Sequence, residues 1–122
     1  MNKKAGGADS QEVARLLEQG FGQHQTGNLD EAEDLYHKIL ELDPGHAEAN
    51  HLLGVIALDK ADYPTACTLM EKAVLTNPKH FIAHNNLGNA RTALGDLGQA
   101  GKCYRKALKF KPDYAMAPNN LG

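Results

Sequence analysis

Apolar residues recur with the period of an α-helix along the chain, in short stretches separated by turn residues. Over residues 97–110 they stand at i, i+4, i+7 and i+8, the stripe of a half-buried helix: Ala100, Tyr104, Ala107 and Leu108. The preceding stretch, Phe81–Leu94, contains no helix breaker, and Gly95 and Asp96 form a turn between the two. Pro112 then ends the second stretch, because proline cannot continue a helix. The pattern predicts a pair of helices.

The same helix pair recurs at intervals of 34 residues. Five series of residues keep this interval: Pro44, Pro78 and Pro112; Gly20, Gly54, Gly88 and Gly122; Ala32, Ala66 and Ala100; Tyr36, Met70 and Tyr104; and Gly27, Ala61 and Gly95. We therefore predict repeats over residues 13–46, 47–80 and 81–114, with a partial fourth repeat over 115–122. Residues 1–9 are predicted to be a disordered tail, and residues 10–122 an all-α solenoid of about three and a half helix-turn-helix repeats.

The recurring small residues predict close packing within each repeat. Gly54 shares a helical stripe with Asn50 and Ala57, and we expect this stripe to face Ala66 on the second helix. Glycine opposite alanine allows two helices to approach at the short end of the usual spacing. Before the second helix of this repeat, Asp62 is the predicted N-cap.

This pattern resembles the tetratricopeptide repeat over nearly the whole chain. The third repeat is the closest, with Leu87, Gly88, Ala100, Tyr104, Ala107 and Pro112 at family positions. The resemblance implies antiparallel helix pairs stacked into a right-handed superhelix, whose first helices line a concave groove. Two positions that are aromatic in the family are occupied here by Leu16, Asn50 and His84 and by Gln23, Ala57 and Arg91, which implies looser local packing.

Helical geometry identifies the residues expected on the concave face. If the glycine stripe faces the partner helix, the opposite stripes are Ala14, Glu18, Phe21 and Gln25; Glu48, Leu52, Val55 and Asp59; Ile82, Asn86, Asn89 and Ala93; and Met116 and Asn120, flanked by His51, Asn85 and Asn119. Four of these are large and apolar: Phe21, Leu52, Val55 and Ile82. We interpret them as an exposed partner site, with packing into the groove wall as the alternative.

The segment 84–90 is similar to the repeats that precede bacterial and eukaryotic O-linked sugar transferases. In those repeats, asparagines form a ladder that holds a peptide backbone, and Asn86 and Asn120 occupy equivalent positions here. A carboxamide suits this role because it both donates and accepts hydrogen bonds. The equivalent residues in the earlier repeats are Glu18 and Leu52, so the ladder is predicted only in the C-terminal half.

Another subset of the family clamps the terminal carboxylate of chaperones with groove lysines and arginines. The corresponding groove residues here include no basic side chain: Leu17, Phe21, Leu52, Ile82 and Asn86. We therefore do not expect binding of that kind.

Composition narrows the function further. The 122 residues include 13 Lys and Arg against 15 Asp and Glu, a net charge of −2, which argues against a nucleic-acid-binding module. No apolar run approaches the roughly 20 residues of a membrane span, and the N-terminus lacks the apolar core of a signal peptide. Cys67 and Cys103 are too few for a disulfide framework, so we expect buried free thiols and a cytoplasmic protein.

Catalysis and cofactor binding find no support in the sequence. Ser10 is the only serine, and the Leu-Gly pairs lie inside helices rather than in a phosphate-binding loop. His80 and His84, at i and i+4, place two rings on one helix face, but no third metal ligand is evident. We predict no catalytic residue, no metal and no cofactor.

The sequence thus favours a non-catalytic scaffold that binds a protein, a peptide or a partner helix in its groove. In one alternative, the chain is the substrate-docking region of a larger transferase, which fits a sequence that stops midway through a fourth repeat. In the other, the chain assembles with itself through an apolar C-terminal edge at Ala115, Met116 and Leu121.

Overall fold

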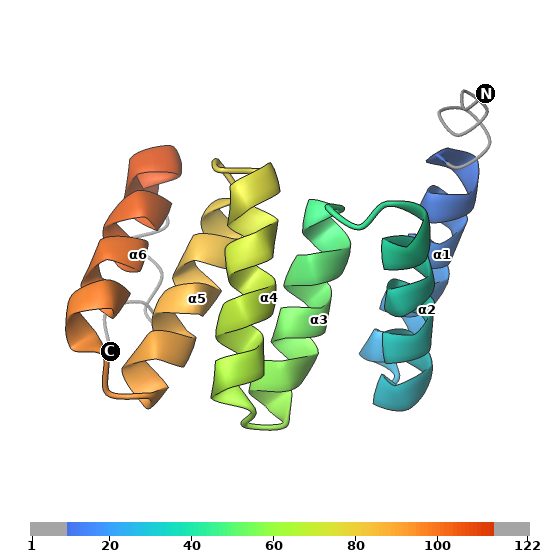
Figure 1. Ribbon diagram of the computed structural model, residues 1–122, viewed down its shortest axis with the longest axis horizontal. Coiled ribbons are helices and arrows are strands. Elements are labelled where there is room, and N and C mark those ends of the chain that lie inside the picture. Colours follow the sequence, from blue (N-terminus) through green and yellow to red (C-terminus); the bar gives the residue numbers. More distant parts are fainter. Residues whose placement is uncertain (1–9, 114–122) are drawn as a thin grey trace.

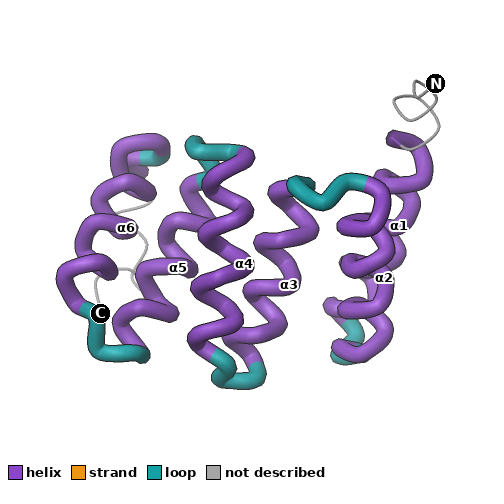
Figure 2. The backbone as a smooth tube through the Cα atoms, viewed as in Figure 1, coloured by secondary structure: helices purple, strands orange, loops and turns teal. Residues whose placement is uncertain are grey.

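The computed structural model describes residues 10–113, and the regular secondary structure in this range is helical. The helices are α1 (Ser10–Gln25), α2 (Leu29–Leu42), α3 (Ala47–Asp59), α4 (Tyr63–Thr76), α5 (Phe81–Ala93) and α6 (Leu97–Phe110). They stack as three antiparallel pairs, with α1 and α2 at one end of the row and α6 at the other (Figure 1). Short loops join successive helices (Figure 2). The predicted all-α solenoid of helix pairs is confirmed.

Turn and cap residues set the helix ends. Gly27 and Gly95 have φ values of +86° and +83°, a conformation that glycine adopts without strain, and Ala61 holds the equivalent turn at φ +60°. Asp62 accepts a hydrogen bond from the Thr65 backbone, which confirms the predicted N-cap. Asp96 caps α6 in the same way.

Histidines cap α3 and α5, the first helices of the second and third repeats. His46 Nδ1 accepts from the Ala49 backbone N–H at 3.0 Å, and His80 Nδ1 accepts from that of Ala83 at 3.1 Å. These histidines are 34 residues apart and begin α3 and α5. The cap has a chemical consequence, because a neutral imidazole whose Nδ1 accepts a hydrogen bond carries its proton on Nε2.

The repeating glycines pack beneath a large side chain rather than opposite the small one predicted. A Cβ added to Gly20, Gly54 or Gly88 would lie within 2.7 Å of Tyr36, Met70 or Tyr104 respectively. The predicted partner of Gly54, Ala66, contributes only a backbone oxygen 3.5 Å from that point. The 34-residue glycine series thus makes room for the Tyr36, Met70 and Tyr104 series.

Polar residues tie down loops at one of the positions where the family has aromatic residues, in the second and third repeats. Buried Asn50 donates through Nδ2 to the carbonyls of Pro44 and His46, at 3.3 and 3.1 Å. Buried His84 bonds the Pro78 carbonyl through Nε2 at 2.7 Å. The bonds to the two prolines span six residues, so each fastens the loop before its own helix.

The core runs along the row of helices. Buried Leu16, Tyr36, Ile39 and Ile56 form one cluster, and Met70, Leu87, Cys67 and Cys103 belong to a second. Both cysteines are buried free thiols, as predicted, and burial raises the pKa of each. Over residues 10–113, no helix has the length and apolar character needed to cross a membrane.

Candidate functional site

An apolar hollow lies between α1 and α3 on the face predicted to be concave. It has a volume of about 330 Å³ and is lined by Ala14, Leu17, Glu18, Phe21, Glu48 and Leu52. We call these six residues the α1/α3 pocket. Apart from Leu17, they belong to the stripes expected from helical geometry. Phe21 keeps 47% of its surface exposed, which is a large apolar area for a side chain on a helix.

The four large apolar residues predicted to form one exposed patch divide into two kinds. Phe21 and Ile82 are exposed, at 47% and 40%. Leu52, in contrast, is only 7% exposed and forms the floor of the α1/α3 pocket. Val55 is half-buried and packs against the second core cluster. The expectation of a four-residue exposed patch was therefore wrong, and the wall-packing alternative holds for Leu52 and Val55.

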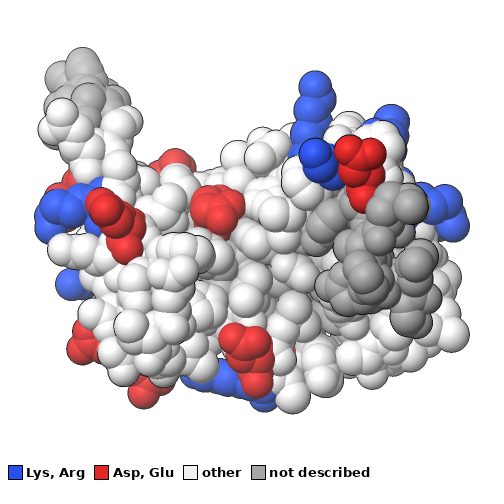
Figure 3. Space-filling view, turned by 180° about the vertical axis from the view of Figure 1, so that it is seen from behind, with Lys and Arg blue, Asp and Glu red and all other residues white. Residues whose placement is uncertain are grey.

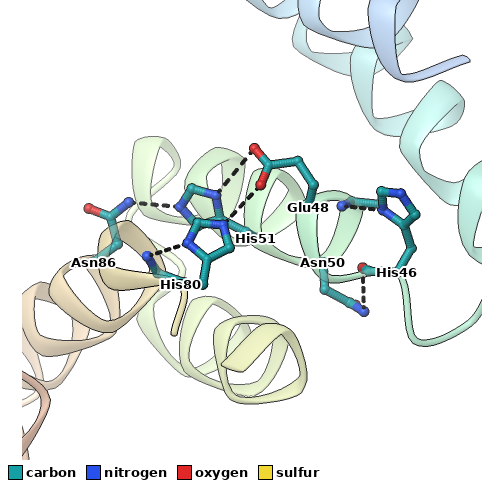
Figure 4. Close-up of polar contacts among 8 residues, drawn as sticks. His46, Glu48, Asn50, His51, His80 and Asn86 are labelled. Carbon is teal, nitrogen blue, oxygen red and sulfur yellow. Dashed lines mark hydrogen bonds and ion pairs between the residues drawn. The ribbon is translucent and has the colours of Figure 1, made fainter. Parts of the chain in front are cut away.

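A polar cluster adjoins the pocket at Glu48 (Figure 4). Glu48 Oε1 lies 2.9 Å from His80 Nε2, and its Oε2 lies 3.8 Å from His51 Nδ1. On the far side, Asn86 Nδ2 lies 3.0 Å from His51 Nε2. The two imidazole rings are 4.6 Å apart between centroids. We call Glu48, His51, His80 and Asn86 the junction cluster, because it links the second repeat to the third.

The junction cluster holds Glu48 in its ionised form. The nearby rings of His51 and then His80 hold the pKa of Glu48 far below its usual range, against the opposing effect of partial burial. The Glu48 side chain is nevertheless 42% exposed, so its negative charge faces the groove as well as the histidines.

Glu48, His51 and His80 are also a conceivable metal-ligand set, since one donor atom from each lies within 4.8 Å of the others. The hydrogen bonding does not fit that use. A metal-bound histidine normally donates its other ring N–H to an acceptor. In His80 that second nitrogen, Nδ1, instead accepts the Ala83 N–H, which leaves the proton on the nitrogen that faces Glu48.

The histidine pair considered from the sequence does not form a common site. His84 turns away to bond Pro78 and stacks on Phe110, with ring centroids 6.0 Å apart. Sequence reasoning missed the junction cluster because its members come from two repeats. The spacing of Glu48 and His51, at i and i+3 on one helix, was the available signal.

The remaining predicted groove residues are partly engaged in contacts of their own. Asn89 Oδ1 accepts from the Tyr104 hydroxyl at 2.8 Å, and Asp59 lies 3.7 Å from His24. Asn85 and His51 are buried, so they support the groove from beneath rather than along its open flank. Gln25 is exposed. Asn119 and Asn120, and with Asn120 the second rung of the asparagine ladder, lie outside the described residues.

A second hollow, of about 480 Å³, lies between α4 and α6, and residues of α5 form its floor. Its residues include Leu75, Leu87 and Phe110, and a row of lysines at i, i+4 and i+7: Lys102, Lys106 and Lys109. Sequence analysis did not single out this α4/α6 hollow, although the lysine spacing was visible. Its basic rim contrasts with the acidic α1/α3 pocket.

Helix pairs stacked in a row, with a hollow along their first helices, define a helical-repeat solenoid. Residues 24–74 and 81–114 match family models described as tetratricopeptide repeat. The chain belongs to the tetratricopeptide repeat family, as its sequence pattern indicated.

Solved structures of this family are similar over most of the chain. The first tetratricopeptide domain of Spaghetti (RPAP3), bound to the HSP90 peptide SRMEEVD, is 29% identical with a TM-score of 0.85, covering 92% of this chain and 89% of that one. MamA is 26% identical with a TM-score of 0.81, covering 98% and 70%. A search of curated proteins gave no match.

A mutant of the Thermobaculum terrenum O-GlcNAc transferase is also similar, at 30% identity and a TM-score of 0.83. The match covers 87% of this chain but only 20% of the transferase. The chain therefore spans about one fifth of that enzyme.

Proposed function

We propose that this protein is a non-catalytic interaction scaffold whose α1/α3 pocket anchors an apolar side chain of a peptide or partner helix. The observation that carries the proposal is the exposed Phe21 ring beside a hollow floored by Leu52. Large apolar side chains that desolvate in a hollow supply most of the affinity in protein interfaces.

Three observations support this interpretation. The matched family models describe repeats rather than a catalytic domain. The structurally similar Spaghetti domains were solved with a bound peptide, so the fold presents a surface that an extended chain fits. Asn86 Oδ1 and Asn89 Nδ2 make no hydrogen bond within residues 10–113 and would meet the backbone of such a chain.

The test is capture of partners from a lysate of the source organism on immobilised protein, identified by mass spectrometry. Phe21→Glu places a charge in the pocket and should abolish capture. Leu75→Glu is the matched control, because Leu75 is 82% exposed and lines the α4/α6 hollow instead. If the two variants retain the same partners as the wild type, the pocket is not the binding site.

Docking of a substrate for a larger transferase is a second use of the same groove. The similarity to the O-GlcNAc transferase favours it, and the proposal concerns the groove only.

Self-assembly through Ala115, Met116 and Leu121 involves residues outside the described part of the chain. Sedimentation of the purified protein over a range of concentrations tests it.

A further inference from the structure

The charged residues that line the α1/α3 pocket are both carboxylates. Glu18 is exposed on α1, and Glu48 stands at the start of α3. Arg15, the one Lys or Arg of α1, pairs with Glu12 and does not line the pocket. Asp59 adds a third carboxylate toward the other end of α3, with its side chain 53% exposed. Over the described residues, this part of the groove is apolar and acidic.

The view from behind shows where charged side chains lie over the wider face. Acidic side chains stand near the middle of the face that is drawn in white, and both acidic and basic side chains stand along its margins (Figure 3). The helices α1 and α5 lie behind α2 and α4 in Figure 1, so this is the side of the first helices.

The charge on Glu48 is fixed by the structure. His80 must present its Nε2–H to the carboxylate, since its Nδ1 is occupied by the Ala83 cap. Protonation of the Glu48 carboxylate would weaken the hydrogen bond that it accepts from His80. Glu48 therefore keeps its negative charge when a negatively charged peptide approaches the pocket. A like charge placed beside Glu18 and Glu48 is disfavoured, whereas a lysine or arginine is attracted and is steered toward the pocket.

We infer that the partner of this groove is a peptide segment in which a large apolar side chain is flanked by lysine or arginine. The inference rests on the proposed function and adds the chemistry of the ligand. The apolar side chain fills the α1/α3 pocket, and the flanking cations meet Glu18 and Glu48. The net charge expected of this segment is opposite in sign to that of SRMEEVD, the peptide bound by the similar Spaghetti domain, in which one Arg stands against two Glu and one Asp.

A phage-displayed library of random heptapeptides tests the inference, because it offers the pocket every charge pattern at once. Peptides are selected on the wild-type protein and depleted on Phe21→Ala, which removes the apolar ring without changing the charge, so that only pocket-dependent sequences remain. Enrichment of Lys and Arg next to a large apolar residue is the expected result. Enrichment of Asp and Glu, or no charge bias, overturns the inference and leaves the proposed function standing. A library with no sequence that depends on Phe21 overturns the proposed function itself, and the inference with it.

A matched pair of peptides measures the preference directly. SRMEEVD and SRMKKVK, in which the three acidic residues are replaced by lysine, share the same Arg, Met and Val, and their affinities are compared by fluorescence polarisation at low ionic strength. We expect SRMKKVK to bind at least about fivefold more tightly, as expected for a few exposed charge pairs, with the difference shrinking at high salt. Equal binding, or tighter binding of SRMEEVD, contradicts the inference.

The variant Glu18→Lys assigns the preference to the pocket. It should reduce the ratio of the two affinities by about fivefold. Glu41→Lys makes the same change in net charge on the exposed surface of α2 and should leave the ratio unchanged. If both variants reduce the ratio equally, net charge rather than the pocket selects the peptide.

Discussion

The lack of a side chain at Gly20, Gly54 and Gly88 determines how closely the two helices of each repeat approach. At each position, a large residue of the second helix occupies the space that a Cβ would need. This large residue is a tyrosine in both the first and the third repeat, but the two tyrosines differ in burial. Tyr36 is fully buried, whereas Tyr104 is half-buried and bonds Asn89 near the surface. Identical substitutions should therefore have different costs.

We predict that Gly20→Ala lowers the free energy of unfolding by about 1 kcal/mol or more, because buried Tyr36 has no room to move. Gly88→Ala should cost less, since the Tyr104 ring can shift toward solvent. Gly22→Ala on the same helix as Gly20 meets nothing within 4 Å and should stabilise by roughly 1 kcal/mol through helix propensity. Urea denaturation of the three variants checks this order. A cost for Gly22→Ala as large as that for Gly20→Ala would contradict it.

The buried ring of His84 gives the fold a dependence on pH. Burial lowers the pKa of His84, so its folded form binds a proton less readily than its unfolded form. Stability should then fall as the pH drops below about 6.5, the ordinary pKa of histidine. The lowered pKa of Glu48 acts in the same direction, but only below its ordinary pKa of about 4.3.

The variant His84→Asn separates these effects. Asn50, one repeat earlier, already bonds the loop proline through its side chain, so asparagine at position 84 should keep the bond to Pro78. We expect the variant to lose stability less steeply than the wild type between about pH 6.5 and 5. Denaturation at several pH values measures the two slopes. Equal slopes would exclude His84 as the source.

At the scale of helices, the junction cluster couples α3 to the loop before α5. The bond between His80 and Glu48 spans 32 residues and ties the cap of α5 to the start of α3, and the contact between His51 and Asn86 joins the second repeat to the third. Solenoids depend on such nearest-neighbour contacts, because each repeat touches only its neighbours. The ring of His46, the equivalent cap one repeat earlier, bonds the start of α3, the helix that it caps.

A double-mutant cycle isolates this coupling. His80→Asn keeps an N-cap residue but removes the ring that bonds Glu48, and Glu48→Gln removes the charge. We predict a coupling free energy of about 1 kcal/mol between the two changes, discounted for the partial exposure of Glu48. The matched cycle with His46→Asn should show no coupling. Equal coupling in both cycles would mean that the cap, not the ion pair, is responsible.

At the scale of the whole molecule, periodic features were predictable and contacts between repeats were not. The 34-residue series predicted the helix pairs, and the opposite stripe predicted most residues of the α1/α3 pocket. The same reasoning misplaced Leu52, because a stripe gives the direction of a side chain but not the depth to which a neighbouring helix covers it. It missed the pairing of Glu48 with His80, since residues 32 apart meet only after two helices have stacked.

The central claim is that a ligand occupies the pocket between α1 and α3. The most direct measurement is the change in backbone amide chemical shifts when a Phe21-dependent peptide from the library is added to the labelled protein. We predict the largest changes at residues 14–21 and 48–52, with none of comparable size around Leu75 and Lys106. Changes concentrated instead along α4 and α6 would place the ligand in the α4/α6 hollow and contradict the account.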